Sequence, residues 1–360
     1  MDRAHRLPDN NKESKREEII MLRRRALLSM PLVAAAGVVR AQTADWAKVV
    51  EAANKQGHLN VMHNVPPPGG DTWFETFKKA YPGITVEATR LGSSALAQRF
   101  PTEYAAGASQ TDAVMTLFDD TLVKWQRDGW IRPVSVPEAA GMPAHYRRDD
   151  RMFTIQLTRS VAVSNKNKVR EKDAPREWAD FFDPKWKDKV GMDPPWRSVV
   201  VQGMIAEWDA VGLKDTARRL KANGVRFFNG SAGVIQALIR GDINVAPVIE
   251  SPVVSALADG APLRVVFPNS GVPAMESMAF LPEKAPHPEA GLVFLNWVLS
   301  KEGQQALQDI TGATVTRPGV TPSKILPGVE GQKIVLATDV LTPERQKAII
   351  DEWRSVFGLQ

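Results

Sequence analysis

The chain has no cysteine and only three tyrosines among its 360 residues. Without cysteine it can form no disulfide framework, no thiolate metal site and no thiol nucleophile. Its weakly charged N-terminal run, residues 26–39, is shorter than the roughly 20 apolar residues that a membrane-spanning helix needs. A chain of this length can fold without disulfides because it buries a large apolar core.

The N-terminal segment has the pattern of an export signal. Three consecutive arginines, residues 23–25, precede the weakly charged run, and Val39 and Ala41 place small residues three and one positions before a cleavage point. A basic region, an apolar region and a small-residue site, in that order, are typical of a secretory signal peptide. We predict that residues 1–41 are this signal, cut near Ala41, and that the mature protein lies in the periplasm. The arginines suit twin-arginine export as well as ordinary export.

Removal of this segment changes the charge of the protein. The whole chain has a formal net charge of +5, and residues 1–41 hold nine of its 46 Lys and Arg but only five of its 41 Asp and Glu. The remainder is almost balanced, so its charge gives no reason to expect nucleic acid as a partner.

Motifs of the common enzyme classes are missing from the sequence. It contains no G-x-G-x-x-G, P-loop, G-x-S-x-G or H-E-x-x-H pattern. The four histidines beyond residue 41 are scattered, with no acid or serine at a diagnostic spacing: His58, His63, His145 and His287. An enzyme is the main rival class, but we predict a protein with no catalytic residues, no cofactor and no metal site.

The rest of the chain alternates β-type runs with helical runs, which is typical of α/β layering. Strands are predicted over 59–63, 84–88, 113–115, 161–163, 190–192, 243–248 and 263–267. Helices are predicted over 71–80, 95–106, 121–127, 198–210, 232–240 and 288–299. The length after the signal suits two lobes, and no low-complexity linker divides them, so we expect the chain to cross between lobes through ordered strands.

Small polar residues follow several predicted strands, just ahead of helices. In open α/β sheets, ligands bind beyond the carboxyl ends of the strands, where helix N-termini offer N–H groups to anionic or polar ligands. Each such residue alone is also an ordinary helix cap, but their occurrence in both halves favours a shared binding cleft. The candidates are Asn64, Ser93, Ser94, Ser198, Gly230 and Ser231.

Trp196 and Arg197, next to Ser198, are the most specific pair among these loops. An indole can form the wall of a pocket, while a guanidinium can bind a carboxylate or phosphonate through two parallel hydrogen bonds. Either residue alone is more often part of a surface or a core.

The order of several short blocks resembles the periplasmic solute-binding proteins of ABC importers, in the branch that contains ferric-ion, thiamine and phosphonate binders. The blocks include Gly57–Val61, Gly129–Pro133 and Gly241–Ile243, and the most specific is the late one that holds His287–Ala290 and Glu302–Gln304. The resemblance covers roughly residues 57–308. It implies an α/β, two-lobed type 2 periplasmic-binding fold, with a central cleft, a strand hinge and closure on the ligand.

The resemblance also implies how the chain is divided and where it binds. Lobe 1 is expected to comprise residues 42–158 and 249–325, and lobe 2 residues 159–248, with C-terminal helices in 326–360 packing back on lobe 2. Ligand contacts are expected at Asn64, Ser93, Ser94, the Arg197–Ser198 turn, the Gly230–Ser231 turn, and the loop after Val248, which carries Glu250 and Ser251.

One departure from the family bears on the ligand. Ferric-ion binders of this branch use two adjacent tyrosines where this chain has Glu250, Ser251 and Pro252, and its tyrosines are never adjacent. Phenolate and carboxylate oxygens suit Fe³⁺, and serine or proline cannot replace them. Iron is therefore not expected, and a ferric-ion binder with atypical ligands is kept as an alternative.

The ligand predicted from these residues is a small organic anion, a carboxylate rather than a phosphonate, bound by Arg197 and by helix N-termini. A flat apolar part of the ligand could rest near Trp196, and Glu250 would suit an amine on the same molecule. The expected partner is the membrane permease of an ABC transporter, and the protein is expected to be a monomer. A ligand-loaded partner of an envelope sensor would have the same sequence features.

Overall fold

The computed structural model describes residues 45–65, 69–321 and 323–359, and only the backbone of Ser93 and Ser94. The chain divides between Lys48 and Val49, and the unit that begins at Val49 is described below. The predicted signal segment and its cleavage point near Ala41 lie outside the described residues. Within the described ranges, no helix is both long enough and apolar enough to span a membrane.

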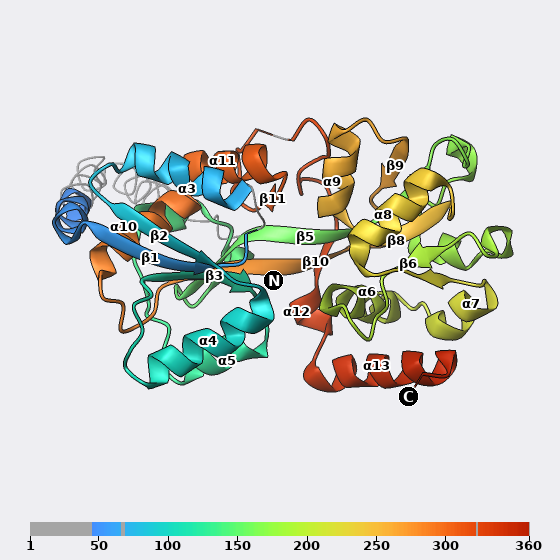
Figure 1. Ribbon diagram of the computed structural model, residues 1–360, viewed down its shortest axis with the longest axis horizontal. Coiled ribbons are helices and arrows are strands. Elements are labelled where there is room, and N and C mark those ends of the chain that lie inside the picture. Colours follow the sequence, from blue (N-terminus) through green and yellow to red (C-terminus); the bar gives the residue numbers. More distant parts are fainter. Residues whose placement is uncertain (1–44, 66–68, 322, 360) are drawn as a thin grey trace, which may run out of the picture. The chain divides into compact units, whose positions relative to one another are not determined.

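Three parallel strands and their connecting helices form the first part of this unit (Figure 1). The elements are β1 (His58–His63), α3 (Gly69–Ala80), β2 (Thr85–Arg90), α4 (Ser93–Ala105), β3 (Ala113–Leu117) and α5 (Asp120–Arg127). β1 lies between β2 and β3, with Val61 opposite Ala88 and Ala113. Helical crossovers are what parallel strands require, and every predicted element of this part is confirmed to within about two residues at each end.

Two long antiparallel strands run side by side through the middle of the unit (Figure 1). They are β5 (Met152–Asn165) and β10 (Val272–Phe280). The first part of β5 pairs with β10, from Met152 opposite Phe280 to Arg159 opposite Ala274. From Ser160 onward β5 pairs with β8 (Val245–Ile249) and β9 (Leu263–Val266) instead. The sequence predicted only 161–163 of β5 and nothing of β10.

We use "the β3 side" for β1 to β3 with α3, α4, α5, α10 (Pro288–Leu299) and α11 (Lys301–Thr311), and "the β8 side" for the elements around β8 and β9. The β8 side contains β6 (Gly191–Met192), α6 (Val199–Ala210), α7 (Thr216–Ala222), β7 (Arg226–Phe227), α8 (Gly230–Arg240) and α9 (Glu250–Ala258). Its core is rich in aromatic rings, among them Trp178, Phe181 and Trp208.

Two late helices, α10 (Pro288–Leu299) and α11 (Lys301–Thr311), complete the β3 side by packing on α3. The indole N–H of Trp73 donates to the carbonyl of Gly303 at 2.9 Å. A Cβ at Gly303 would lie 2.1 Å from the carbonyl oxygen of Trp297, so only glycine allows the turn between the two helices to close this tightly.

The C-terminal segment returns to the shared strands and then to the β8 side. After β11 (Thr314–Val315), the strand β12 (Ile334–Leu336) pairs with the start of β10. Helix α12 (Ala337–Val340) contacts β10 and α6, and α13 (Pro343–Phe357) contacts α6 and α7. The remaining short elements are β4 (Arg147–Arg148) and the 3-10 turns Pro137–Gly141, Ala144–Tyr146, Glu171–Asp173, Trp178–Phe182 and Pro184–Trp186.

Packing suggests where a division into two lobes would fall. Residues of α9 and β9, such as Val253 and Leu263, share a core cluster with Val161 and Val163 of β5. We therefore propose that residues 250–267 belong with lobe 2, whereas the sequence assigned residues 249–325 to lobe 1. β5 and β10 would then form the hinge.

Candidate functional site

On the β3 side, the loop after β3 presents Phe118, Asp119 and Asp120. Asp119 caps α5, because its carboxylate accepts the backbone N–H groups of Thr121 at 2.9 Å and Leu122 at 3.4 Å. Asp120 is exposed in the first turn of the same helix. Acidic residues at a helix N-terminus are stabilised by the helix dipole, so this terminus is already occupied by the chain's own carboxylates.

On the β8 side, the loop after β6 places a carboxylate at another helix start. Asp193 accepts the backbone N–H of Gly230, the first residue of α8, at 3.2 Å. Burial raises the pKa of Asp193, against the opposing effects of the Gly230 and Ser198 hydrogen bonds and the nearby charge of Arg197. Ser198 caps α6 by accepting the N–H of Val201 at 3.4 Å. Both helix starts therefore have a protein partner.

Helix α4 differs from α5, α6 and α8. The residue before it, Gly92, provides no side-chain cap, and the first four N–H groups of a helix have no partner within the helix. The side chains of the predicted contacts Ser93 and Ser94 lie outside the described atoms. Asn229, the residue before α8, also provides no side-chain cap, but Asp193 accepts the N–H of Gly230 at that helix start. Backbone N–H groups at the start of α4 are of the kind that can bind an anion.

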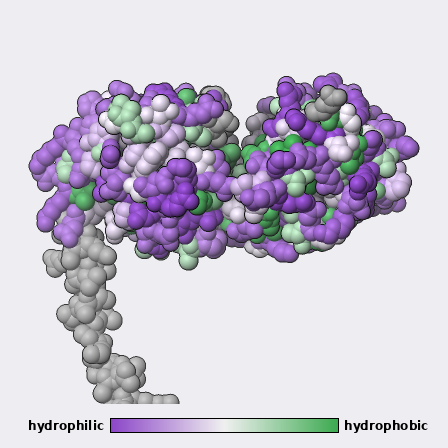
Figure 2. Space-filling view, turned by 90° about the horizontal axis from the view of Figure 1, so that it is seen from below, coloured by the Kyte–Doolittle hydropathy of each residue, from purple (hydrophilic) through white to green (hydrophobic). Residues whose placement is uncertain are grey.

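A small cavity lies between the β3 side and the β8 side. It encloses about 70 Å³. Figure 2 shows a notch in the surface between the two halves of the unit, with apolar surface beside it. The lining residues come from the loop after β3, the start of α6, β10 and the C-terminal helices: Phe118, Asp119, Asp120, Val199, Met275, Ala337, Thr338, Leu341 and Gln346.

An ion pair between Arg148 and the buried Glu276 contacts two residues of the cavity lining, Phe118 and Thr338. Glu276 of β10 is fully buried and accepts hydrogen bonds from Thr154 at 2.6 Å, Arg148 at 2.7 Å and Thr338 at 2.8 Å. The guanidinium carbon of Arg148 lies 4.3 Å from the centroid of the Phe118 ring, within the range of a cation–π contact. Among the described residues, the buried Nε of Arg148 has no hydrogen-bond partner.

The predicted contacts are spread over several environments. Asn64 is half-buried at the end of β1, where its N–H donates to the carbonyl of Met115 at 3.1 Å. Arg197 is exposed, Ser231 is half-buried near the start of α8, and Ser251 is exposed on α9. None of these lines the cavity described above. The sequence analysis placed a candidate loop next to Val199, but it gave no binding role to the loop that carries Phe118, and it carried no signal for Met275 or for the C-terminal lining.

Trp196 is packed within the β8 side. Its ring lies 4.8 Å from Phe227 in an edge-on contact and 6.4 Å from Phe357 of α13. The indole therefore belongs to a partly buried aromatic group that includes the end of the chain. This packing differs from the sequence prediction of an open pocket wall.

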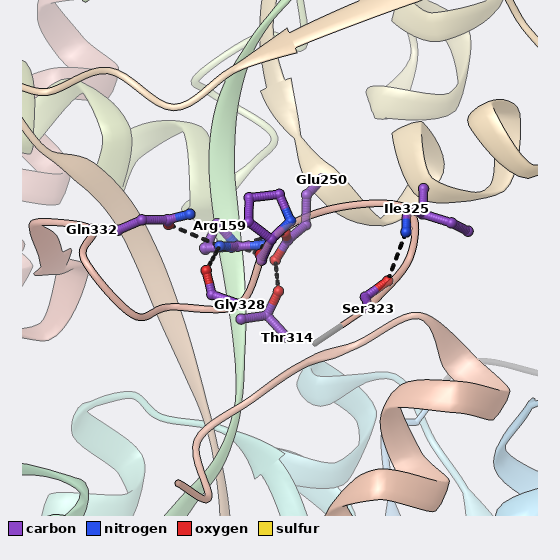
Figure 3. A network of polar contacts seen from close by, with 8 residues as sticks. Arg159, Glu250, Thr314, Ser323, Ile325, Gly328 and Gln332 are labelled. Atoms are coloured by element: carbon purple, nitrogen blue, oxygen red, sulfur yellow. Dashed lines mark hydrogen bonds and ion pairs between the residues drawn. The ribbon is translucent and has the colours of Figure 1, made fainter. Parts of the chain in front are cut away.

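Glu250 is engaged in a second buried ion pair, in which Figure 3 shows Arg159 of β5 between Glu250 and the loop before β12. The Nε of Arg159 donates to Glu250 at 2.8 Å, and Thr314 donates to the other carboxylate oxygen at 2.8 Å. Arg159 also donates to the carbonyls of Pro327 and Gly328 and to Gln332. Because both oxygens of Glu250 are bonded, this differs from the prediction that Glu250 contacts a ligand amine.

His63 is buried at the end of β1 against the ring of Phe74, 4.8 Å away. Burial lowers its pKa to about 4, partly opposed by Asp71 and assisted by Arg90, so the imidazole is neutral at pH 7. Neither ring nitrogen has a hydrogen-bond partner among the described residues. Within the same residues, no three His, Asp or Glu side chains come together as a metal site.

A larger concavity, about 400 Å³, lies along β1, β2 and α4 and includes His58, Glu87 and Arg99. All of its lining belongs to the β3 side and to His287, next to α10. Movement of the β8 side could not close over a ligand there, so we place the candidate site at the cavity between the two sides.

Known proteins are similar to this chain over most of its length. The family model of bacterial extracellular solute-binding proteins matches residues 72–327. A Salmonella typhimurium protein that carries the provisional name 2-aminoethylphosphonate-binding periplasmic protein is 24% identical over 317 residues, which cover 84% of this chain and 87% of that protein.

Solved structures share the fold. The substrate-binding protein of an ABC transporter from Agrobacterium tumefaciens has a TM-score of 0.68 and 20% identity, covering 83% of this chain and 94% of that one. Iron-bound HitA from Pseudomonas aeruginosa has a TM-score of 0.69 and 19% identity, covering 83% and 99%. The predicted type 2 periplasmic-binding fold is thereby confirmed.

The family consists of carriers, which bind a solute without converting it, and this agrees with the prediction that the protein is not an enzyme. The family model covers well over half of the chain, and the fold is the one that the sequence resemblance implied. The chain belongs to the bacterial extracellular solute-binding protein family.

Proposed function

We propose that the protein captures a small organic anion, a carboxylate or phosphonate, in the periplasm and delivers it to the permease of an ABC transporter. The observation that carries this proposal is the cavity whose lining comes from both the β3 side and the β8 side. Such a site changes when the two sides move about a hinge, so ligand binding would stabilise a closed form.

The anionic group of the ligand would bind at the start of α4. The side chains of Asp119, Ser198 and Asp193 accept backbone N–H groups at the starts of α5, α6 and α8, whereas Gly92 provides no side-chain cap at the start of α4. Ser93 and Ser94 stand at this position. Arg197, exposed beside the start of α6, is the proposed charge partner from the β8 side. The phosphonate named for the Salmonella relative has the same kind of anionic group.

Iron is the second candidate, because HitA carries it. In this chain Glu250 is bonded to Arg159, and the position of the tyrosine pair holds Ser251 and Pro252. His63 is buried with a lowered pKa. These observations favour an organic anion over Fe³⁺, whose preferred ligands are oxygen donors such as phenolate and carboxylate.

The proposal includes export and a monomeric state, with nucleic acid excluded as a partner. The relatives named above include a periplasmic protein, and the signal predicted over residues 1–41 would give a mature N-terminus at or near Gln42. N-terminal sequencing of protein taken from the periplasm tests this, and an N-terminus at residue 2 or 3 would contradict it. A pull-down from the envelope separates delivery to a permease from loading of a sensor.

A thermal-shift screen of carboxylates, phosphonates, amino acids, neutral sugars and metal salts tests the ligand class. A ligand that binds only the folded protein raises the melting temperature by mass action. We expect organic anions to raise it, followed by a calorimetric titration with one molecule bound per chain. The proposal is wrong if only neutral sugars or cations give a shift.

A further inference from the structure

Two of the four histidines beyond residue 41 lie side by side, although they are far apart in the sequence. The ring centroids of His58 and His287 are 5.9 Å apart, and the ring planes are inclined by 42°. Both residues line the larger concavity, of about 400 Å³, along β1, β2 and α4. His63 is buried, and His145 is exposed outside this concavity. We call His58 and His287 the histidine pair.

His287 is held in one orientation by Asp112. Its Nδ1 lies 3.0 Å from one carboxylate oxygen of Asp112, and its backbone N–H donates to the other at 2.6 Å. Asp112 is fully buried and also accepts the backbone N–H of Asn60 at 2.8 Å. Because an ionised carboxylate only accepts hydrogen bonds, Nδ1 of His287 carries the proton and Nε2 keeps its lone pair.

The histidine pair is brought together by the packing of α10 on β1 (Figure 1). His58 is the first residue of β1, and His287 directly precedes α10. A Cβ at Gly291 of α10 would lie 3.0 Å from the carbonyl oxygen of Asp112, so the glycine allows the helix to approach the sheet this closely. The core of the β3 side therefore sets the position of the pair.

His58, in contrast, has a ring that is free to turn. It is exposed, and its ring makes no hydrogen bond with the residues that the structure describes. Rotation of this imidazole therefore breaks no bond. A fixed ring that presents Nε2, beside a ring that can turn toward it, is an arrangement that can close on an ion.

The separation of the two rings suits a metal ion between them. A metal about 2.0–2.1 Å from an imidazole nitrogen lies about 3.2 Å from the ring centroid, so two ligating rings have centroids about 5.2 Å apart at a tetrahedral angle and about 6.4 Å apart at most. The observed distance of 5.9 Å lies between these values. A small rotation of His58 is enough to complete the geometry.

The charges around the histidine pair favour a cation. Glu87 is exposed and lines the same concavity, and the buried Asp112 lies behind His287. Arg99, which also lines the concavity, is paired with Glu103 at 2.6 Å. With neutral imidazoles this region has an excess of negative charge, which raises the local concentration of cations.

We infer that His58 and His287 bind a divalent transition-metal ion, such as zinc, nickel or copper, at a site separate from the cavity between the two sides. Imidazole nitrogen suits these metals, whereas magnesium and calcium prefer oxygen ligands. The contact between Asp112 and His287 is the kind that orients metal-ligating histidines in proteins.

This site is open. Among the described residues no third His, Asp or Glu joins the pair, so water completes the coordination and the ion can exchange. The sequence predicted no metal site, because its histidines are scattered along the chain. The inference goes beyond the proposed function and does not rest on it.

Titration calorimetry with zinc chloride tests the inference, on protein without a polyhistidine tag, which would itself bind metal. We expect one zinc ion per wild-type chain and no binding of magnesium. His58→Gln and His287→Gln should each lower the affinity for zinc at least about tenfold, the effect that loss of a supporting carboxylate alone has on metal sites. His145→Gln removes an exposed histidine outside the pair, so it is the matched control and should leave the affinity unchanged.

Nuclear magnetic resonance locates the ion. Zinc should move the imidazole nitrogen signals of His58 and His287 and leave those of His145 in place, which a purely structural role of the pair would not produce. Circular dichroism confirms that each variant is folded. The inference is overturned if wild type binds no zinc, if both variants of the pair bind zinc like His145→Gln, or if the signals of the pair do not move.

The organic anion found by the thermal-shift screen separates this site from the solute site. His58→Gln should bind that anion as tightly as wild type, because the concavity belongs to the β3 side and to His287. A loss of anion affinity in His58→Gln would overturn the inference of a separate site. A failure of zinc binding leaves the proposed capture of an organic anion standing, and that proposal fails only by its own screen.

Discussion

The two buried ion pairs beside the shared strands differ in how completely their arginines are bonded. Arg159 has 1% of its side chain exposed and donates to Glu250, to Gln332 and to two backbone carbonyls. Arg148 has 29% of its side chain exposed, pairs with Glu276, and keeps a buried Nε without a described partner. The first arrangement joins three segments of the chain, and the second contacts two residues that line the cavity between the two sides.

The difference shows how to separate structural from functional charge in this protein. A buried charge that loses its partner is strongly destabilising, because it cannot be solvated. When a charged side chain reaches solvent, removal of its partner lowers the free energy of unfolding much less. Arg197, on the loop before α6, is the exposed member of the three arginines. Its substitution should therefore affect ligand binding and not stability.

Glu250→Gln should have the largest effect. The substitution keeps the shape of the side chain but leaves the Arg159 guanidinium buried without a counter-charge, so we expect the free energy of unfolding to fall by about 3–5 kcal/mol. Denaturant unfolding followed by tryptophan fluorescence measures it. A loss below 1 kcal/mol would mean that Arg159 is compensated by the carbonyls alone.

Glu207 differs from Glu250, because it is a buried glutamate with no charge partner in contact. It is fully buried on α6, and neither carboxylate oxygen has a hydrogen-bond partner among the described residues. Burial raises its pKa to about 7, with Glu177 adding to the rise and Lys333 opposing it. The folded state therefore keeps a proton that the unfolded state has released between pH 4.5 and 7, and stability falls as pH rises through this window.

Glu207→Gln should remove this pH dependence. At pH 8 the variant should be more stable than wild type by about 3 kcal/mol, and at pH 4 the two should be nearly equal. Urea unfolding of both proteins from pH 4 to pH 8 is the measurement. Parallel stability curves would show that Glu207 ionises normally in the folded protein.

Glu276→Gln should cost less than Glu250→Gln, although both glutamates are buried. Part of Arg148 already reaches solvent, so the loss should be about 1.5–3 kcal/mol, the value of hydrogen bonds to a charged group. Measuring both variants in the same denaturant series tests the comparison directly. Equal losses would remove the distinction between the two ion pairs.

Arg197→Ala should have the smallest effect on stability, within about 0.5 kcal/mol, as expected for an exposed side chain. Its affinity for the organic anion found in the screen should fall by roughly 1.5–3 kcal/mol. Arg127→Ala, an exposed arginine on α5, is the control and should leave affinity unchanged. If Arg197→Ala binds like this control, the anion has another charge partner.

The sequence predicted the elements whose pattern is local. Helices α3, α4 and α5 and strands β1 to β3 were found because apolar residues recur with the helical or strand period. β10 and the first part of β5 were missed because they are buried on both faces and carry Thr154, Arg159 and Glu276. These polar residues look unfavourable in a core until their partners, far away in the sequence, are known.

For the candidate site, too, the sequence could predict only features that depend on a local pattern. Strand ends and helix starts pointed to one edge of the sheet, because that rule depends on topology, but none of the predicted contact residues lines the cavity. Whether a helix start is free depends on contacts such as Asp193 with Gly230, which join loops of different strands. The wall that carries Thr338 and Leu341 comes from a segment more than 200 residues after Phe118, and no local pattern indicates it.

Native mass spectrometry of the protein purified from the periplasm tests the central proposal most directly. We expect one small organic anion per chain, released when the protein is denatured in the gas phase or by acid, and absent after unfolding and refolding in ligand-free buffer. Adding the identified anion back should restore the original mass and raise the melting temperature. A bound iron ion or neutral sugar in its place would contradict the proposal that this carrier captures an organic anion.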